Sequence, residues 1–253
     1  MPKKLFEIKN LSFSYHTLSG ETKVLQNISF SVNYGEFVSV VGPSGCGKST
    51  LLSLISGMIK PEEGQITFSD GYIPKMGYML QRDHLLEWRN IYQNAILGLE
   101  INKLKTAENL SYTEHLLKEY GLYDFMYKKP RELSGGMKQR VALIRTLSLK
   151  PEILLLDEPF SALDFQTRLI VSKDISNIIR KEHKTAILIT HDISEAIRLS
   201  DKVIVLSHRP ATIKKQMDIS LSTTTDSPLS YLEAPEYASY FQKLWEDISY
   251  EDN

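Results

Sequence analysis

Apolar and polar residues alternate at the start of the chain with the period of a β-strand. Leu11, Phe13 and Tyr15 fall on one face of an extended segment, and the serines between them fall on the other. The turn-like segment 17–23 follows, and the alternation then resumes over 28–32. This pattern predicts a pair of antiparallel strands at the beginning of the fold.

Later apolar runs are continuous instead of alternating. Segment 36–41 leads into a glycine-rich loop, and further runs lie at 153–156, 186–189 and 203–206, separated by stretches of helical periodicity. Continuous runs of this length are typical of parallel strands that are covered on both faces. Segment 48–58, KSTLLSLISGM, leaves the glycine-rich loop as a predicted helix.

The middle of the chain has a helical pattern. Segment 106–121 starts with a threonine suited to an N-cap and ends at a glycine, and segment 134–150 repeats apolar residues at helical spacing. We therefore expect a single α/β domain with a mixed-sheet core and an inserted helical subdomain. The expected parts of this domain, 1–253, are a core at 1–81 and 151–220, a helical insert at 82–150 and a helical tail at 221–253.

Composition limits the function classes. The 253 residues carry 30 Lys and Arg against 31 Asp and Glu, so the net charge of −1 gives no electrostatic case for nucleic-acid binding. Cys46 is the single cysteine, which excludes an internal disulfide. The first ten residues lack the apolar region of a secretory signal, and no apolar run approaches the ~20 residues that span a bilayer.

The sequence VVGPSGCGKST (40–50) matches G-x-x-x-x-G-K-[ST] between a strand and a helix, which predicts a RecA-like P-loop NTPase. Backbone N–H groups of such a loop surround a β-phosphate, Lys48 bridges β- and γ-oxygens, and Ser49 offers a hydroxyl to Mg²⁺. The alternative is a tight glycine turn with a surface lysine. The candidate nucleotide-binding residues here are Gly42, Pro43, Ser44, Gly45, Cys46, Gly47, Lys48, Ser49 and Thr50.

Two adjacent acids follow the buried run ILLL (153–156). Asp157 at the carboxyl edge of a sheet suits a Mg²⁺ ligand, and Glu158 suits a group that polarises the attacking water. The alternative is a solvated strand end.

A third element, LSGGM (133–137), also exposes N–H donors at a predicted helix start. Ser134, Gly135 and Gly136 would face an anion. One chain has only one γ-phosphate to hold, so this second phosphate-facing turn is redundant unless it faces the nucleotide of another copy.

GPSGCGKST, LSGGMKQR, LLLDEPFSALD and LITHD occur in the order and spacing of ATP-binding cassette (ABC) ATPases, and the chain resembles this family over residues 5–210. The resemblance implies a head-to-tail homodimer that encloses two MgATP. It further implies that Tyr15 stacks on adenine, that Gln81 reaches Mg²⁺ and the γ-phosphate, that His191 contacts the γ-phosphate and that 161–164 crosses the dimer interface.

Alternatives stay open for several of these residues. Tyr15 also suits a core-facing aromatic, because it alternates with Leu11 and Phe13, and a histidine such as His191 is often structural. Cys46 suits either a small filler or a redox-sensitive group, and the following helix N-terminus is expected to depress its pKa.

The family resemblance also implies partners. These are integral membrane permease subunits that dock on segment 80–100, and a separate extracytoplasmic solute-binding protein. The sequence LLEW (85–88) resembles that of the subgroup that imports nitrate, sulfonates, taurine or vitamin precursors. The resemblance to this subgroup implies a peripheral location on the cytoplasmic face of the membrane. The apolar residues of 80–100 could equally pack inside the helical insert. Export or lipoprotein release, a non-transport ABC ATPase and a P-loop kinase are the alternative functions.

The tail segment 235–248 carries Tyr237, Phe241, Leu244 and Ile248 at helical spacing. We expect this stripe to pack on the body of the same subunit, with a partner-facing role as the alternative.

Overall fold

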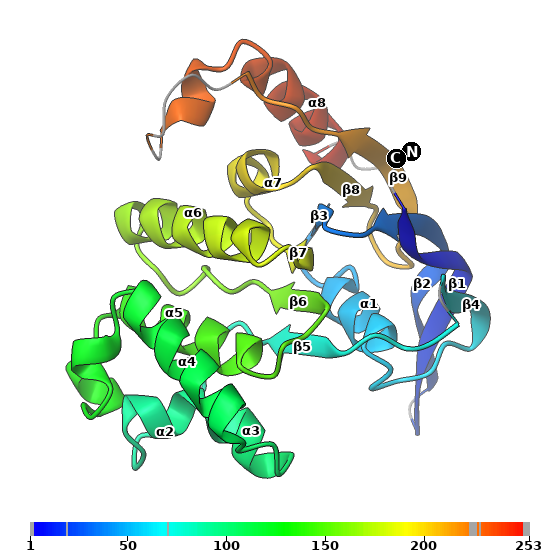
Figure 1. Cartoon of the computed structure of the whole chain (residues 1–253). Coiled ribbons are helices and arrows are strands. Elements are labelled where there is room, and N and C mark those ends of the chain that lie inside the picture. Colours follow the sequence, from blue (N-terminus) through cyan, green and yellow to red (C-terminus); the bar gives the residue numbers. More distant parts are fainter. Residues whose placement is uncertain (1–2, 19, 70, 223–226, 228, 250–253) are drawn as a thin grey trace. The chain divides into compact units, whose positions relative to one another are not determined.

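The computed structural model of the chain describes residues 3–18, 20–69, 71–222, 227 and 229–249. The chain forms two compact units, one made of Met1–Pro74 with His183–Asn253 and the other of Lys75–Glu182 (Figure 1). The two units divide the motifs: the glycine loop and His191 belong to the first, and the acidic pair and the LSGG turn belong to the second.

The first unit begins with an antiparallel sheet, as predicted. Its strand order is β2-β1-β4, formed by β1 (Lys4–Thr17), β2 (Gly20–Asn33) and β4 (Glu63–Phe68). Phe6 lies at its centre, with ring centroids 6.4 Å from Phe30 and 5.7 Å from Phe68.

The predicted facing of β1 is wrong near its end. Register shifts interrupt the β1–β2 pairing between Ile8 and Leu11, between Leu11 and Phe13 and between Phe13 and Ser14. Each irregularity changes which residues face the core, because side chains in a strand alternate strictly. Ser14 is therefore buried, and Tyr15 is 46% exposed instead of sharing the buried face of Leu11.

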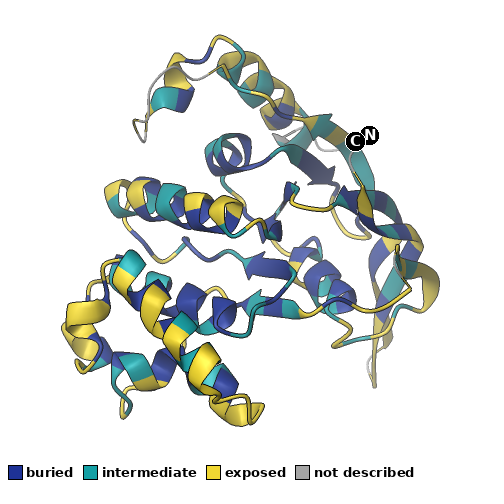
Figure 2. Cartoon of the chain, in the orientation of Figure 1, coloured by how far each residue is buried: buried dark blue, intermediate teal, exposed yellow. Residues whose placement is uncertain are grey.

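The first unit also contains a mixed sheet. β3 (Phe37–Val41) pairs in parallel with β7 (Thr185–Ile189) and β8 (Lys202–Leu206), and β9 (Ile213–Asp218) is antiparallel to β8. The continuous apolar runs thus form buried parallel strands, as expected, and Figure 2 shows them dark blue. Helices α1 (Lys48–Ile55) and α7 (Ile193–Leu199) follow β3 and β7.

The C-terminal segment of the first unit packs on its own subunit. α8 (Tyr237–Ser249) follows the short helix η3 (Ser230–Glu233), and Leu244 is fully buried against residues of β3, α7 and β8. The predicted packing of the apolar stripe is therefore confirmed. The polar stretch 222–228 lies largely outside the described residues.

The second unit combines a strand pair with helices. β5 (Met76–Met79) pairs in parallel with β6 (Ile153–Asp157). Thr106 caps α4 as the sequence predicts, with its Oγ1 accepting the Asn109 N–H at 3.2 Å. Its helices are α2 (Ile91–Ala95), α3 (Leu97–Ile101), α4 (Ala107–Glu119), η1 (Tyr123–Phe125), η2 (Pro130–Glu132), α5 (Gly135–Leu147) and α6 (Phe165–Lys181). The domain boundaries expected from the sequence remain predictions.

Candidate active site

The glycine loop lies between β3 and α1, and two of its glycines have no room for a side chain. Gly42 has φ +156°, and an added Cβ would lie 2.8 Å from the carbonyl oxygen of Leu206. Gly47 has φ +118°, and its Cβ would lie 2.6 Å from Val24 Cγ1. Both positions therefore require glycine for space and for backbone conformation. The resulting bare-backbone loop before a helix N-terminus fits a phosphate.

Lys48 is held inside this loop. Its side chain is buried, and its Nζ donates to the carbonyl oxygens of Gly42 and Pro43, each at 2.8 Å. An ammonium has three N–H donors, so these bonds leave one for an anion. The two carbonyls fix the position of the charge beside the loop, and the alternative of a surface lysine is wrong.

Tyr15 lies next to the start of α1. Its hydroxyl is 3.3 Å from Thr50 Oγ1, and its ring packs edge-on against Phe13 with centroids 5.0 Å apart. Because the ring is 46% exposed, the core-facing alternative is wrong. An exposed, anchored aromatic ring suits stacking on a planar base.

His191 follows β7 at the same edge of the mixed sheet as the glycine loop. Val40 of β3 is in register with Ile189 of β7, so the glycine loop and His191 both leave the carboxyl ends of neighbouring parallel strands. Ligands of open α/β sheets bind at this edge. The His191 side chain is exposed there.

Three predicted residues gather in the second unit. Glu158 follows β6 with φ +46°, and Ser161 Oγ donates to its carbonyl oxygen at 3.0 Å. Gln81, just past β5, donates from Nε2 to Ser161 Oγ at 3.1 Å and lies 3.5 Å from Glu158 Oε2. A left-handed conformation is uncommon for glutamate. This conformation changes the direction of the chain after Asp157 and places the Glu158 carboxylate beside Gln81.

The residues present fit a magnesium ion with few protein ligands. Asp157 accepts a hydrogen bond from the Tyr78 hydroxyl at 3.2 Å, which orients its carboxylate. Among the described residues there is no group of three or more His, Cys, Asp or Glu that could hold a metal. Mg²⁺ typically takes one or two protein oxygens and completes its shell with water and substrate phosphates. A carboxylate, a serine hydroxyl and an amide oxygen, the predicted set, are donors of that kind.

The LSGG turn begins α5 as predicted. Ser134 is its N-cap, with Oγ accepting the Met137 N–H at 3.3 Å. Gly135 is exposed, whereas Gly136 is buried, and a Cβ on Gly136 would lie 2.7 Å from Val171 Cγ2 of α6. The turn lines an open hollow of about 200 Å³ together with Ile170. Gly136 is thus needed for close packing, and Ser134 and Gly135 remain accessible at the helix start.

The expectation of a depressed Cys46 pKa is wrong. The thiol is buried, and burial raises the pKa of Cys46. The nearby charge of Lys48 and backbone hydrogen bonds act in the opposite direction and are outweighed. Desolvation disfavours the thiolate more than the helix start favours it.

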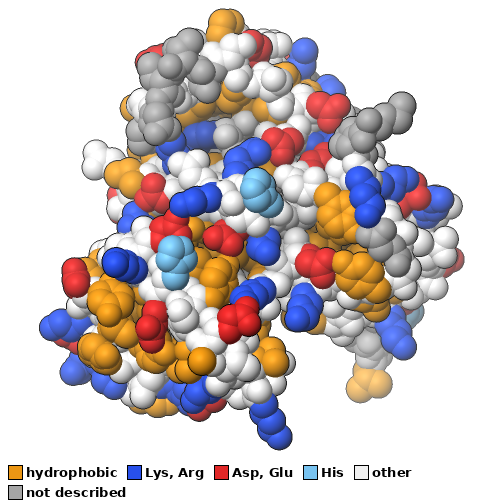
Figure 3. Space-filling model, viewed as in Figure 1, with side chains coloured by type: hydrophobic (Ala, Val, Ile, Leu, Met, Phe, Trp, Pro, Cys, Tyr) orange, Lys and Arg blue, Asp and Glu red, His pale blue; other side chains and the backbone are white. Residues whose placement is uncertain are grey.

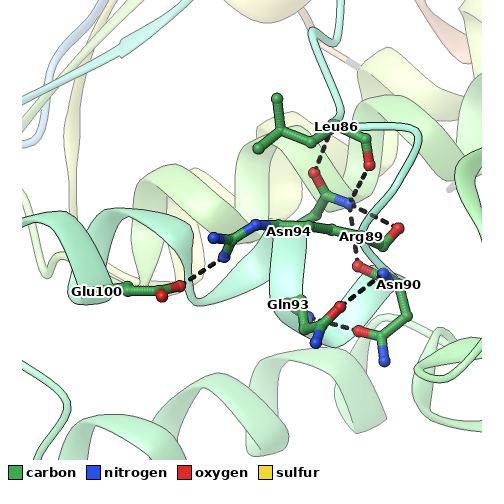
Figure 4. Close-up of polar contacts among 6 residues, drawn as sticks. All are labelled: Leu86, Arg89, Asn90, Gln93, Asn94 and Glu100. Atoms are coloured by element: carbon green, nitrogen blue, oxygen red, sulfur yellow. Dashed lines mark hydrogen bonds and ion pairs between the residues drawn. The ribbon is translucent and has the colours of Figure 1, made fainter.

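A polar centre that the sequence analysis did not single out shapes segment 83–90. Asn94 is fully buried; it accepts from the Leu86 N–H at 2.7 Å and donates to the carbonyl oxygens of Leu86, Arg89 and Asn90 (Figure 4). Asn90 and Gln93 add a reciprocal capping box. An asparagine in an apolar helical pattern is the only sequence signal for this role.

The same segment presents an exposed tryptophan. Trp88 is 73% exposed, although Leu85 and Ile91 around it are buried. Its carbonyl oxygen accepts from Lys129 Nζ at 2.7 Å, and Arg145 donates to the carbonyl oxygens of Asp83 and His84. Most apolar residues of 80–100 therefore pack inside, and Trp88 remains on a loop held from several sides.

The glycine loop, its buried lysine and the mixed sheet define the class of P-loop nucleoside triphosphatases. The family model described as ABC transporter matches residues 25–161, more than half of the chain. The chain belongs to this family and is an ATP-binding subunit with ATPase chemistry.

Individual relatives agree. The chain is 41% identical to the uncharacterized ABC transporter ATP-binding protein YtlC of Bacillus subtilis, with 96% of this chain and 95% of YtlC covered. It is 38% identical to the nitrate transport protein NasD of Klebsiella oxytoca, covering 87% of each. A solved dimer of the ATP-binding cassette MJ0796 bound to ADP and Pi matches with TM-score 0.69 at 28% identity, over 85% of this chain and 99% of that one.

Proposed function

We propose that this protein hydrolyses MgATP as a head-to-tail dimer and drives import of a small solute through a separate permease. Lys48 and the loop N–H groups bind the phosphates, Ser49, Gln81 and Asp157 hold Mg²⁺, and Tyr15 stacks on adenine. When bound, Mg²⁺ neutralises charge that develops on the phosphate oxygens. Glu158 orients and polarises the attacking water, and His191 contacts the γ-phosphate.

The observation that carries the dimer is the second accessible helix start at Ser134 and Gly135. Nearby on α6, Phe165 is 64% and Ile170 is 50% exposed, an apolar surface suited to a protein partner. MJ0796, a cassette of the same family, is dimeric in its solved structure. A second copy would place its own triphosphate against this turn.

Replacing Glu158 with Gln tests this mechanism. The amide keeps the size of the side chain and removes the carboxylate, so we expect ATP binding to persist, turnover to fall by at least about 10²-fold and a dimer to accumulate on size-exclusion chromatography with ATP. Lys48→Ala is the matched control, which should lose nucleotide affinity and stay monomeric. A Glu158→Gln protein that remains monomeric with ATP and hydrolyses it at the wild-type rate would refute the proposal.

Trp88 marks the surface on which we place the permease. Backbone hydrogen bonds join Ile91 to Lys128 and Tyr92 to Met126, so the Trp88 loop runs beside a segment whose Tyr127 is 77% exposed. Figure 3 shows apolar side chains gathered over the part of the molecule that carries α2 to α4. Exposed aromatics on a held loop are typical anchors of a protein interface.

The two tryptophans of the chain provide a matched pair of variants. Trp88→Ala should abolish co-purification of integral membrane subunits while leaving the ATPase rate of the isolated protein unchanged. Trp245→Ala, on α8 and 56% exposed, should leave co-purification intact. Equal recovery of membrane subunits by both variants would contradict this docking surface.

The proposed cargo is a nitrate-, sulfonate- or taurine-like anion or a vitamin precursor, supported by the similarity to NasD.

No described helix meets the length and hydropathy needed to cross a bilayer. We place the protein as a peripheral subunit on the cytoplasmic membrane face. Isolating the native complex and screening its extracytoplasmic binding protein for ligands by thermal shift tests the proposed cargo and the proposed import. A complex whose permease has a large periplasmic domain and no binding protein would favour export.

A further inference from the structure

The turn between β8 and β9 (residues 207–212) is fastened beside the glycine loop. The turn is closed by a hydrogen bond from the Ser207 N–H to the Thr212 carbonyl at 2.9 Å. It is joined to β2 by the Ala211 N–H, which donates to Val24 O at 2.8 Å, and by the Gln26 N–H, which donates to Ala211 O at 2.9 Å. These backbone bonds give the turn a defined position relative to β2.

β2 in turn contacts the glycine loop directly. Val24, the residue bonded to the turn, is the one whose side chain leaves no room for a Cβ at Gly47. The turn, β2 and the glycine loop are therefore neighbours within the first unit. A side chain on the turn therefore reaches the glycine loop from a defined position.

Arg209 extends from this turn to the glycine loop and donates from Nη2 to the carbonyl oxygen of Gly45. The other side of that peptide group is the N–H of Cys46. In a planar trans peptide the C=O and N–H point in opposite directions, so fixing the Gly45 carbonyl also fixes where the Cys46 N–H points. On its N–H side this peptide has a long hydrogen bond, from the Cys46 N–H to the Pro43 carbonyl oxygen at 3.4 Å, and Gly45, with φ +76°, has no side chain that limits its rotation.

We propose that Arg209 is a positioning residue for phosphate binding: it holds the Gly45–Cys46 peptide so that the Cys46 N–H points into the loop. The inference rests on the proposed phosphate-binding role of the loop. Arg209 acts from outside, through a carbonyl, and does not itself touch the phosphate. Its positive charge also makes the bond stronger than one between neutral groups.

The surroundings of Gly45 support a specific role for this contact. Among described residues other than Gly45 and its two chain neighbours, Arg209 Nη2 is the one atom within 4 Å of the position that a Gly45 Cβ would occupy, at 3.9 Å. The Arg209 side chain is itself exposed. Removing it therefore opens no cavity in the core, and its loss should affect the peptide more than the fold.

Nucleotide affinities of variants test the proposal, with ADP and AMP as probes. Arg209→Met removes the donor but keeps the length, and should weaken ADP binding about 3- to 10-fold. AMP affinity should stay unchanged, because AMP lacks the β-phosphate. The melting temperature without nucleotide should shift by no more than about 1–2 °C. Arg209→Lys, which retains a charged donor, should recover most of the ADP affinity.

Two further variants separate the possible failures. Lys23→Ala removes an exposed charge from β2, and should leave ADP affinity unchanged. Lys48→Ala should lose ADP binding; if it does not, the proposed role of the loop fails. If Lys48→Ala loses binding while Arg209→Met binds ADP like the wild type, or weakens ADP and AMP equally, the inference about Arg209 is overturned and the function stands.

Discussion

Gly47 combines a left-handed backbone with a contact that excludes a Cβ, and Gly35 has only the first of these. Gly35 has φ +71° and nothing within 4 Å of its Cβ position, whereas the Gly47 Cβ would lie 2.6 Å from Val24. Gly35→Ala should therefore cost about 1 kcal/mol of unfolding free energy, from backbone strain alone. Gly47→Ala should cost about 2–4 kcal/mol, because overpacking is added, and should abolish ADP binding. Urea unfolding and ADP titration check both, and equal costs would contradict the packing argument.

Cys46 should be slow to react, with a pH dependence set by its raised pKa. Alkylation requires the thiolate, and a higher pKa means a smaller thiolate fraction at neutral pH. The labelling rate by iodoacetamide should therefore keep rising above pH 9, where an unperturbed thiol with pKa 9.0 begins to level off. MgATP should slow it further by covering the loop. Because Cys46 is the single cysteine, its alkylation is followed by intact-mass spectrometry, with the urea-unfolded chain as the control.

Either of two results would contradict this prediction. A rate that levels off below pH 8 would mean a depressed pKa, and undiminished labelling with MgATP bound would count against the loop as the phosphate site. The pKa of Cys46 is raised because the effect of burial outweighs that of the Lys48 charge.

The candidate residues that stand in motifs were recognisable from the sequence, and the residues that fix the backbone of loops were not. Lys48 and Glu158 stand in short motifs whose spacing is dictated by phosphate geometry. Arg209 and Asn94 carry no motif themselves and act by donating to backbone carbonyls of other residues. Such contacts depend on how a turn or loop is placed in space, which no local pattern encodes.

At the scale of elements, strands and helices followed from periodicity where one face is uniformly buried. β3, β6, β7 and β8 are continuous apolar runs, and all are parallel strands. The end of β1 failed because register shifts there reverse the facing of Ser14 and Tyr15. A bulge is set by pairing with a distant strand, so alternation within the strand alone does not reveal it.

Two N-caps of similar chemistry separate stability from catalysis. Thr106 caps α4 and Ser134 caps α5, each accepting a backbone N–H three residues ahead and each exposed. Thr106→Ala and Ser134→Ala should therefore each cost about 1 kcal/mol of unfolding free energy. Only Ser134→Ala should reduce ATP turnover, about tenfold or more, because only that hydroxyl is proposed to face a phosphate. Similar turnover in the two variants would contradict the proposed contact between Ser134 and a phosphate and would leave Ser134 only the role of a helix cap.

At the scale of the whole molecule, the motifs fall in separate compact units. Lys48 and His191 belong to the first, and Glu158 and Ser134 belong to the second. Motif order in the sequence therefore predicts which chemical groups exist, but not which copy of the chain supplies each group to one ATP. Only an experiment on assembled protein separates a site completed within one copy from one completed between two.

Mixing two impaired variants makes that distinction. In a head-to-tail dimer of Lys48→Ala with Ser134→Ala, one site combines both defects. The other combines the intact loop of the Ser134→Ala copy with the intact turn of the Lys48→Ala copy. A Lys48→Ala copy stays monomeric by itself, but it can pair with a Ser134→Ala copy whose intact loop holds ATP. Each mixed dimer has one intact site of two, so mixing should raise turnover well above the mean of the two separate variants, towards about half of the wild-type value per mixed dimer.

If both motifs served the same ATP within one copy, every copy in the mixture would be defective and turnover would not rise above the mean of the two separate variants. Steady-state phosphate release, measured before and after mixing, provides the readout. Lys48→Ala mixed with Glu158→Gln is a control in which the proposal predicts no recovery, because the loop and the acid serve the same ATP from the same copy. In that mixed dimer one site lacks the lysine and the other lacks the carboxylate. Recovery in the first mixture but not in the second requires that the LSGG turn acts across the dimer while Glu158 acts within its own copy.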